Sequence, residues 1–169
     1  MTRRAPIRVA EVLEVTLPLL RPFVTGFGVT PSRRTVLVHL VGEDGTQGWG
    51  EAAALDHPYY LPDTTSTTFE TTHEYALPLA LATGSLDPAD VSGALQRIRG
   101  NTFARAGVEQ AFWSLTAATA GVSLRELIGG SLDQVPVGES LGITDTIEET
   151  LDEVLLRLDE GYRRIKLKI

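Results

Sequence analysis

Residues 163–169 read RRIKLKI and residues 135–143 read VPVGESLGI, and the two stretches lie on either side of one amphipathic segment. Both stretches are rich in aliphatic and β-branched residues, which predicts two strands. Between them, apolar side chains recur at helical spacing over residues 147–158, just after a Thr146-x-x-Glu149 capping-box pattern. A strand, a helix and a second strand in this order predict a parallel pair joined by a right-handed crossover.

The chain before this unit has a different order of elements. Residues 7–20 roughly alternate apolar and polar side chains and predict a strand. Residues 35–41 and 47–54 predict a hairpin around a Gly-Glu-Asp-Gly-Thr turn. Residues 21–31 and 56–63 are rich in proline, and the first also in glycine, so we expect both to be loops.

After residue 63 the apolar period becomes helical. Asp87 followed by Pro88 predicts a helix start with Asp87 as the N-cap. Strands followed by helices favour an α+β domain over residues 1–128. Two parallel strands and one helix cannot bury both faces of a sheet, so we expect residues 129–169 to be an incomplete domain and the chain to be the front part of a longer protein. The expected helices cover residues 64–81, 87–98, 103–120 and 123–128.

Composition excludes several functions. The chain has 169 residues, a net charge of −7 and no cysteine. The acidic balance argues against nucleic-acid binding, and the lack of cysteine excludes disulfides, thiol nucleophiles and Cys-based zinc sites. The apolar stretch 76–82 is interrupted by Pro78 and is too short to cross a bilayer. We therefore expect a cytoplasmic protein that binds neither nucleic acid nor membranes.

Lys166 and Lys168 are the most informative residues. They stand two positions apart in a predicted strand, so their side chains point to one face while Ile165 and Leu167 take the other. Because both faces of a parallel strand are normally buried, we expect the two amines to enter an enclosed space. Burial and a neighbouring positive charge each make a lysine easier to deprotonate, as a general base requires. The alternative is an edge strand with its lysines in solvent.

Other patterns are weaker. Gly48-Trp49-Gly50-Glu51-Ala52-Ala53 has the spacing of a dinucleotide fingerprint, but no helix is predicted to open on it, so tight packing is the better interpretation. The three histidines, at positions 39, 57 and 73, share no metal-ligand spacing. Ser140 falls near the end of a predicted parallel strand, where ligands bind in α/β folds, although an ordinary turn serine fits as well.

A set of short motifs runs in a fixed order from about residue 6 to the end of the chain, and the ordered set is far more specific than any one motif. The motifs are Leu17-Pro18-Leu19 leading to Phe23, Phe27-Gly28, Gly48-Trp49-Gly50-Glu51-Ala52, Gly100-Asn101, Ala104-Arg105-Ala106-Gly107-Val108-Glu109, Leu127-Ile128-Gly129-Gly130, Ser140-Leu141-Gly142-Ile143 and residues 161–169 (GYRRIKLKI). Together they resemble the enolase superfamily, in its muconate-lactonising subgroup. Within that subgroup the o-succinylbenzoate synthases and N-acylamino acid (N-succinylamino acid) racemases are the most similar.

The resemblance implies a fold and roles for residues. The fold is an α+β capping domain over residues 1–128, followed by the start of a (β/α) TIM-type barrel, truncated, over residues 129–169. Lys168 would remove the proton α to a substrate carboxylate, giving an enediolate, and Lys166 would assist electrostatically. The implied substrate-binding residues are Phe23, Phe27, Leu55 and Tyr60, which match capping-loop positions, and Ser140, which matches a barrel-strand position.

The chain also departs from the family pattern. The family's Mg²⁺ ligands and its opposing catalytic lysine lie on later barrel strands, so we expect Mg²⁺ in the full-length enzyme but none bound by these residues, and no turnover by this chain alone. The expected partners are a small carboxylate substrate and further copies of the same chain. Three alternatives stay open: a dipeptide epimerase, a muconate cycloisomerase, or a non-catalytic α+β domain that binds or assembles.

Overall fold

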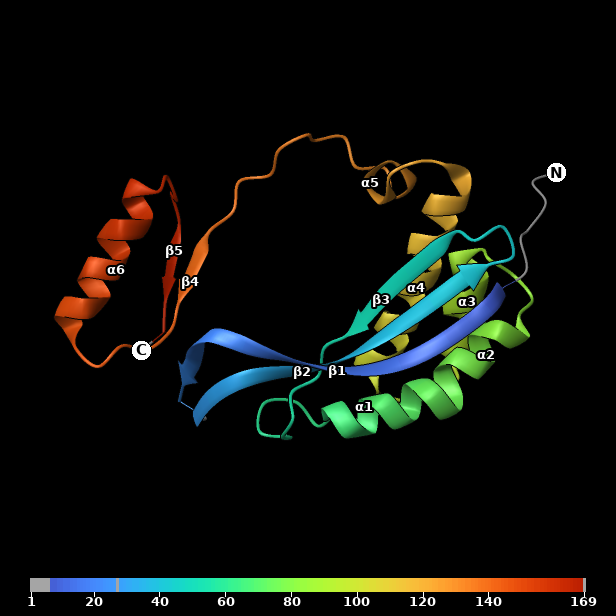
Figure 1. Cartoon of the computed structure of the whole chain (residues 1–169), viewed down its shortest axis with the longest axis horizontal. Coiled ribbons are helices and arrows are strands. Elements are labelled where there is room, and N and C mark those ends of the chain that lie inside the picture. Colours follow the sequence, from blue (N-terminus) through green and yellow to red (C-terminus); the bar gives the residue numbers. More distant parts are fainter. Residues whose placement is uncertain (1–6, 27, 169) are drawn as a thin grey trace. The chain divides into compact units, whose positions relative to one another are not determined.

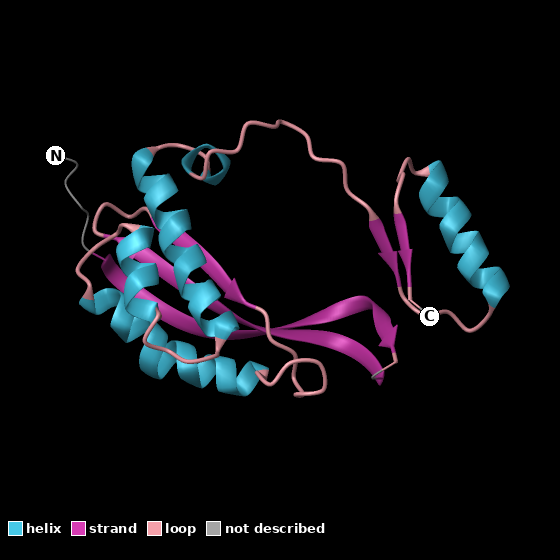
Figure 2. Cartoon of the chain, turned by 180° about the vertical axis from the view of Figure 1, so that it is seen from behind, coloured by secondary structure: helices cyan, strands magenta, loops and turns pink. Residues whose placement is uncertain are grey.

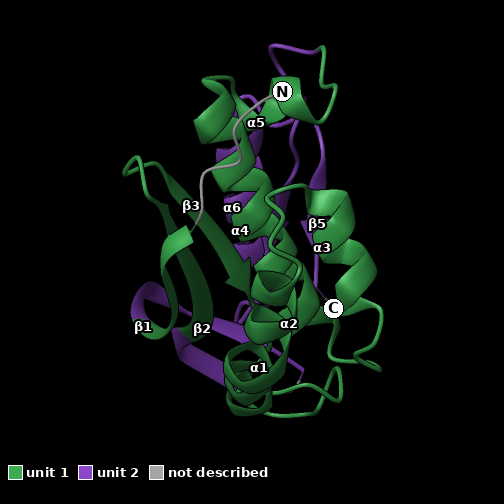
Figure 3. Cartoon of the chain, turned by 90° about the vertical axis from the view of Figure 1, so that its right-hand side faces the viewer, with its two compact units in different colours: residues 1–16, 34–131 green, residues 17–33, 132–169 purple. Residues whose placement is uncertain are grey.

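The computed structural model describes residues 7–26 and 28–168. The chain forms two compact units, one of residues 1–16 and 34–131 and the other of residues 17–33 and 132–169 (Figure 3). Strands β1 (Ile7–Thr25) and β2 (Gly28–Gly42) run from the first unit into the second without a break. The domain division expected from the sequence, after residue 128, stays a prediction.

A three-stranded sheet forms the base of the first unit. β1, β2 and β3 (Gln47–Ala52) lie in that order, and Figure 1 shows the three strands side by side. β2 and β3 pair antiparallel around the predicted turn, which confirms this hairpin. In the turn, the hydroxyl of Thr46 donates to Oδ1 of Asp44 at 2.6 Å, and this hydrogen bond lowers the pKa of the Asp44 carboxyl.

Helices cover one face of this sheet (Figures 1 and 2). The predicted helix over 64–81 is present, with a π-helical turn at its centre, and Asp87 is confirmed as an N-cap because its Oδ1 accepts from the Ala89 N–H at 2.9 Å. The longest helix ends where Gly121 adopts a φ of 69°. The helices are α1 (Thr65–Thr71), η1 (Thr72–Ala76), α2 (Leu77–Ala82), α3 (Pro88–Leu95), α4 (Thr102–Ala120) and α5 (Leu124–Leu127).

The core of the first unit lies between the sheet and these helices. Val38 and Leu40 on β2 contribute side chains that are fully buried, as are Phe112 and Leu115 on α4. Burying a side chain of this size stabilises a fold by about 1.5–3 kcal/mol. The hairpin strand predicted over residues 35–41 and the helix predicted over 103–120 therefore meet in one apolar layer.

Glycines allow α4 to lie directly against β3. A Cβ added to Gly50 would stand 2.0 Å from the Gly107 carbonyl oxygen, and one added to Gly48 would stand 2.4 Å from the Ala111 carbonyl oxygen. On the helix side, a Cβ at Gly107 would meet the Ala52 Cβ at 2.8 Å. The pattern Gly48-Trp49-Gly50 is thus a packing motif, as expected from its context. The backbone of α4 occupies the space that side chains at these two glycines would need.

The second unit contains the predicted β-α-β arrangement. β4 (Glu139–Leu141) and β5 (Ile165–Leu167) pair parallel, and α6 (Ile147–Asp159) joins them. Thr146 and Glu149 form the predicted capping box. The strand expected over 135–143 is shorter than predicted, because β5 offers only three residues for it to pair with.

The apolar stripe of α6 is exposed in the described chain. Ile147 is 75% exposed and Leu155 63%, whereas Thr150, Val154 and Arg157 are half-buried. The helical spacing of the stripe predicted the helix correctly. Most of its apolar side chains are exposed, and Val154 is the member that is half-buried.

The expectation of a loop over residues 21–31 was wrong. β1 continues to Thr25 and β2 begins at Gly28, so the two strands extend as a two-stranded arm. Each strand of such an arm has an open edge where some N–H groups face solvent, and proline is tolerated at those positions. Pro22 and Pro31 therefore do not break the strands. Gly28 has a φ of 129°, which an L side chain rarely adopts.

The contact between β3 and α4 yields a prediction of stability. Gly50→Ala should lower the free energy of unfolding by about 3 kcal/mol or more, because the new methyl group meets backbone atoms that cannot rotate away. Gly93→Ala is the matched control, since Gly93 lies within α3 and a Cβ there meets nothing within 4 Å. This control should stabilise the chain by about 0.5–1 kcal/mol. Chemical denaturation measures both, and equal effects would contradict the packing account.

Candidate functional site

The parallel register of β4 and β5 places two candidate residues on one face. Ser140 is aligned with Lys166, so their side chains point to the same side of the pair. Leu141, one position along β4, is buried on the opposite side, and α6 packs on β4. Lys168 follows β5 directly, two positions after Lys166.

The tip of the arm covers the end of this face. The Nζ of Lys168 lies 4.2 Å from the centre of the Phe23 ring, close enough for a cation–π interaction. The N–H of Ile143, just beyond β4, donates to the carbonyl oxygen of Val24 at 3.5 Å. A Cβ added to Gly142 would meet the same oxygen at 3.6 Å and the Phe23 ring at 4.0 Å. Phe23 therefore lies between the ends of the two strands.

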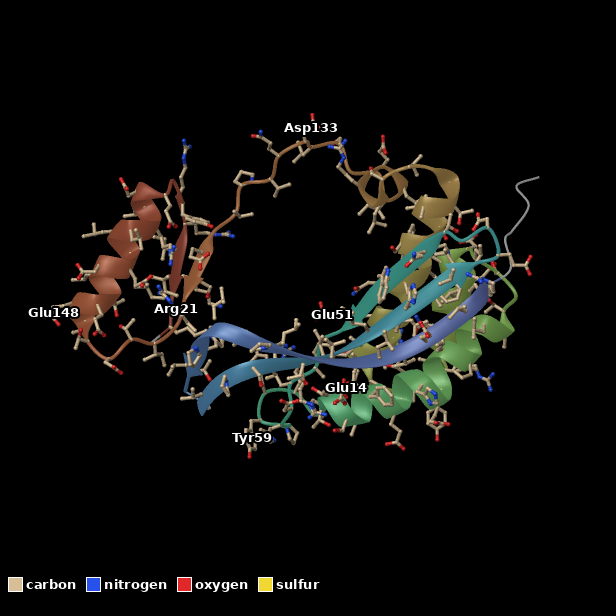
Figure 4. All side chains as sticks on the ribbon, viewed as in Figure 1. Glu14, Arg21, Glu51, Tyr59, Asp133 and Glu148 are labelled. Atoms are coloured by element: carbon tan, nitrogen blue, oxygen red, sulfur yellow. The ribbon has the colours of Figure 1, made fainter. Side chains whose placement is uncertain are left out.

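An ion pair joins the same arm to α6. Arg21, labelled in Figure 4, donates from Nη1 to Oε1 of Glu153 at 3.3 Å. Glu153 is also held by Arg157, one helical turn along, at 3.2 Å. Arg157 binds Glu160 as well, and that hydrogen bond raises the pKa of the Arg157 guanidinium. Sequence patterns gave no sign of the pair of Arg21 with Glu153, because these two residues are 132 positions apart.

The enclosed space expected around both lysines is not formed by the described residues. Lys166 is exposed, and Lys168 is half-buried with Phe23 over its amine. Burial of this face needs neighbouring strands of a sheet. The placement of both amines on one enclosed face stays a prediction.

Lys166 and Lys168 are the only lysines in the chain, and its other thirteen basic residues, out of fifteen, are arginines. An arginine guanidinium is not deprotonated in proteins, whereas a lysine amine is a usable base once its proton is lost. The two amines that could act as a base in this way therefore lie on β5, at Lys166, and directly after it, at Lys168.

Leu55 and Tyr60 belong to the first unit, in the loop before α1. Leu55 is 43% and Tyr60 70% exposed. The structure thus groups Phe23, Ser140, Lys166 and Lys168 in one unit, and these two residues in the other. Phe27 lies outside the described residues.

Arg34 fastens this loop to the sheet. Its Nη2 donates to Oε1 of Glu14 on β1 at 2.8 Å, and its Nη1 donates to Oδ1 of Asp56 at 3.1 Å. The hydrogen bond to Glu14 raises the pKa of the Arg34 guanidinium, which stays charged. Glu14 and the loop residue Tyr59 are labelled in Figure 4. Arg34, which lies on β2, therefore links β1 and β2 to the loop segment that carries Leu55 and Tyr60.

The histidines do not form a metal site. His39 bridges Glu11 and Gln47 at 2.9 and 3.0 Å and stacks on Trp49, which gives it structural partners. Within residues 7–26 and 28–168, no three His, Cys, Asp or Glu side chains gather to hold a metal ion. None of the helices in the described part of the chain has both the length and the hydropathy needed to cross a membrane.

Comparison with known proteins identifies the family. The mandelate racemase / muconate lactonizing enzyme N-terminal domain matches residues 7–129. An o-succinylbenzoate synthase of Geobacillus stearothermophilus is 37% identical over 90% of this chain and 41% of its own length. An N-succinylamino acid racemase of Thermus thermophilus is 40% identical over 96% of this chain and 44% of its own length.

Structural comparison agrees. The crystal structure of a muconate lactonizing enzyme from Pseudomonas fluorescens, complexed with muconolactone, superposes with a TM-score of 0.89 and 27% identity, covering 99% of this chain and 46% of that one. The class of protein is therefore the enolase superfamily, represented by its N-terminal capping domain. Within it, the chain belongs to the mandelate racemase / muconate lactonizing enzyme family. It spans less than half the length of these relatives.

The Arg34 contacts predict how the loop responds to mutation. Arg34→Gln should raise the amide hydrogen-exchange rate of residues 55–61 about two- to fivefold, since partly exposed ion pairs of this kind contribute about 0.3–1 kcal/mol. Arg97→Gln removes an exposed guanidinium of the same unit and should leave the loop unchanged. Unaltered exchange over 55–61 in Arg34→Gln would show that the arginine does not hold the loop.

Proposed function

We propose that the complete protein carrying this chain abstracts the proton α to a carboxylate, in an o-succinylbenzoate synthase dehydration, an N-acylamino acid racemisation, or both. The observation that supports the proposal is Lys166 on β5, with Ser140 aligned beside it, and Lys168 directly after the strand, with Phe23 over its amine. The names of the two curated relatives supply the reaction classes.

Lys168 is the proposed base. The lone pair of its neutral amine takes the α-proton, and the electrons of the broken C–H bond remain on the substrate as an enediolate. Lys166 is the proposed electrostatic partner, because an ammonium beside the site attracts the substrate carboxylate and the negative charge that develops next to it. Ser140, on the same side, offers a hydroxyl that donates to a substrate oxygen.

Mg²⁺ is implied by the family resemblance. The described residues do not fit such a site, since no cluster of three candidate ligands occurs among them. Magnesium therefore belongs to the proposal for the complete protein, and the steps above are carried by the lysines and the serine. A cytoplasmic location and assembly from identical copies also remain predictions.

Muconate cycloisomerisation is the second candidate, favoured by the high structural similarity to a muconate lactonizing enzyme. A dipeptide epimerase and a non-catalytic binding domain are further alternatives. Assay of the complete protein, with Mg²⁺, against a panel containing an N-succinylamino acid, the o-succinylbenzoate precursor, a dipeptide and a muconate separates the enzymes. Absence of turnover on the whole panel would favour the non-catalytic alternative.

Substitution of the proposed base gives a direct test in the complete protein. Lys168→Ala should slow exchange of the substrate α-proton for deuterium by about 10²–10⁴-fold, the usual contribution of general acid–base catalysis. Lys168→Arg should be equally slow, because it keeps the charge but offers no base.

Lys166→Arg is the matched control, since an arginine at that position preserves a positive charge. Its exchange should stay much closer to the unmodified protein. Circular dichroism and thermal melting establish that all three variants fold. Rapid exchange in a folded Lys168→Ala protein would remove Lys168 from its proposed role.

A further inference from the structure

The ring of Phe23 touches the atom on which charge changes in the proposed reaction. We propose that Phe23 stabilises the ammonium that Lys168 becomes when it accepts the α-proton, so that the arm assists the base in addition to covering a substrate. The inference rests on the proposed function and deepens it, because it assigns a second residue to the proton-transfer step.

The sign of the charge change supports this role. Before the transfer, Lys168 is a neutral amine with a lone pair, and the proton is bonded to the substrate. Afterwards the new N–H bond leaves a full positive charge on Nζ, while the former C–H electrons stay on the substrate. An aromatic face attracts a cation within about 6 Å of its centre, and Nζ lies at 4.2 Å. The attraction therefore grows as the proton moves.

Two further contacts hold the segment around Phe23 in place. Arg21 pairs with Glu153 at 3.3 Å on one side of Phe23 in the sequence, and Val24 accepts from the Ile143 N–H at 3.5 Å on the other. Gly142 lies close to the ring, because a Cβ added to it would stand 4.0 Å from Cδ2 of Phe23. These contacts come from α6, from the segment after β4 and from the arm itself. The position of the Phe23 ring therefore does not depend on its contact with Lys168 alone.

This geometry separates two effects of Phe23 on kinetics. An interaction that is stronger in the transition state than with bound substrate changes kcat, whereas uniform binding of the substrate changes KM. A ring that only covers the substrate would act by its size, and its loss would appear mainly in KM. A ring that stabilises developing charge acts by its π face, and its loss appears in kcat.

Kinetics of the complete protein test the proposal. Phe23→Leu keeps an apolar side chain without a π face and should lower kcat by roughly 3- to 30-fold with little change in KM. Phe23→Tyr keeps the π face and should lower kcat less than Phe23→Leu does. Phenylalanine analogues with increasing ring fluorination keep the shape but weaken the negative face, and kcat should fall stepwise with them. A change in KM alone, or a kcat indifferent to fluorination, would overturn the proposal.

Nuclear magnetic resonance of the complete protein, with ¹³C-labelled lysine, tests the contact without any turnover. Spectra of the Lys166→Arg and Lys168→Arg variants assign the εCH₂ signals of these two lysines. The Lys168 εCH₂ protons should be shifted upfield by the ring, and Phe23→Leu should remove that shift while leaving Lys166 unchanged. Identical Lys168 shifts in both proteins would show that the contact is absent and overturn the inference.

The two experiments distinguish the inference from the proposed function. If the unmodified protein exchanges no α-proton although the ring shift is present, the proposed function fails. If the unmodified protein exchanges the proton and Phe23→Leu does so at the same kcat, the inference alone fails.

Discussion

The missing side chains of Gly48 and Gly50 set the distance between the sheet and α4, and the first unit depends on that distance. With the helix backbone directly on β3, the apolar side chains of β2 and α4 interlock in one layer without a gap. β2 is therefore anchored along its second half. The first half of β2 and the second half of β1 extend beyond the sheet as the arm, and Phe23 lies on the β1 strand of this arm. A packing constraint far along the chain thus supports the strands that reach the candidate site.

The proposed chemistry of the site depends on strand alternation and on the use of lysine, where the rest of the chain uses arginine. In a parallel pair, aligned residues share a face, so register alone brings Ser140 beside Lys166, and a step of two adds Lys168. Arginine supplies the positive charge everywhere else, including Arg21 and Arg34, where a permanently charged, multiply donating group binds carboxylates. The two lysines of the chain are Lys166 and Lys168, the residues to which the proposal gives the proton transfer.

The sequence predicted the features that depend on local patterns. The hairpin of β2 and β3, the Asp87 cap, α4, the capping box of α6 and the parallel strand pair are all present, and the α+β class is confirmed by the family match. The loop expected over 21–31 was wrong because proline and glycine signal turns only on average, and an open two-stranded arm tolerates both.

The site was predictable only in part. Spacing identified the shared face of Lys166 and Lys168, and the family resemblance singled out Phe23. The ion pair of Arg21 with Glu153 and the position of the ring over Nζ depend on how segments distant in sequence meet, which no local pattern encodes.

In the proposed mechanism, Lys168 acts as a base beneath the ring of Phe23. The decisive experiment is a crystal structure of the complete protein with a slow carboxylate substrate or analogue. We expect the Nζ of Lys168 to lie about 3–3.5 Å from the α carbon, with the Phe23 ring against the same nitrogen. An α carbon approached by another side chain, with the Lys168 amine in bulk solvent or on the opposite side of its strand from Lys166, would contradict it.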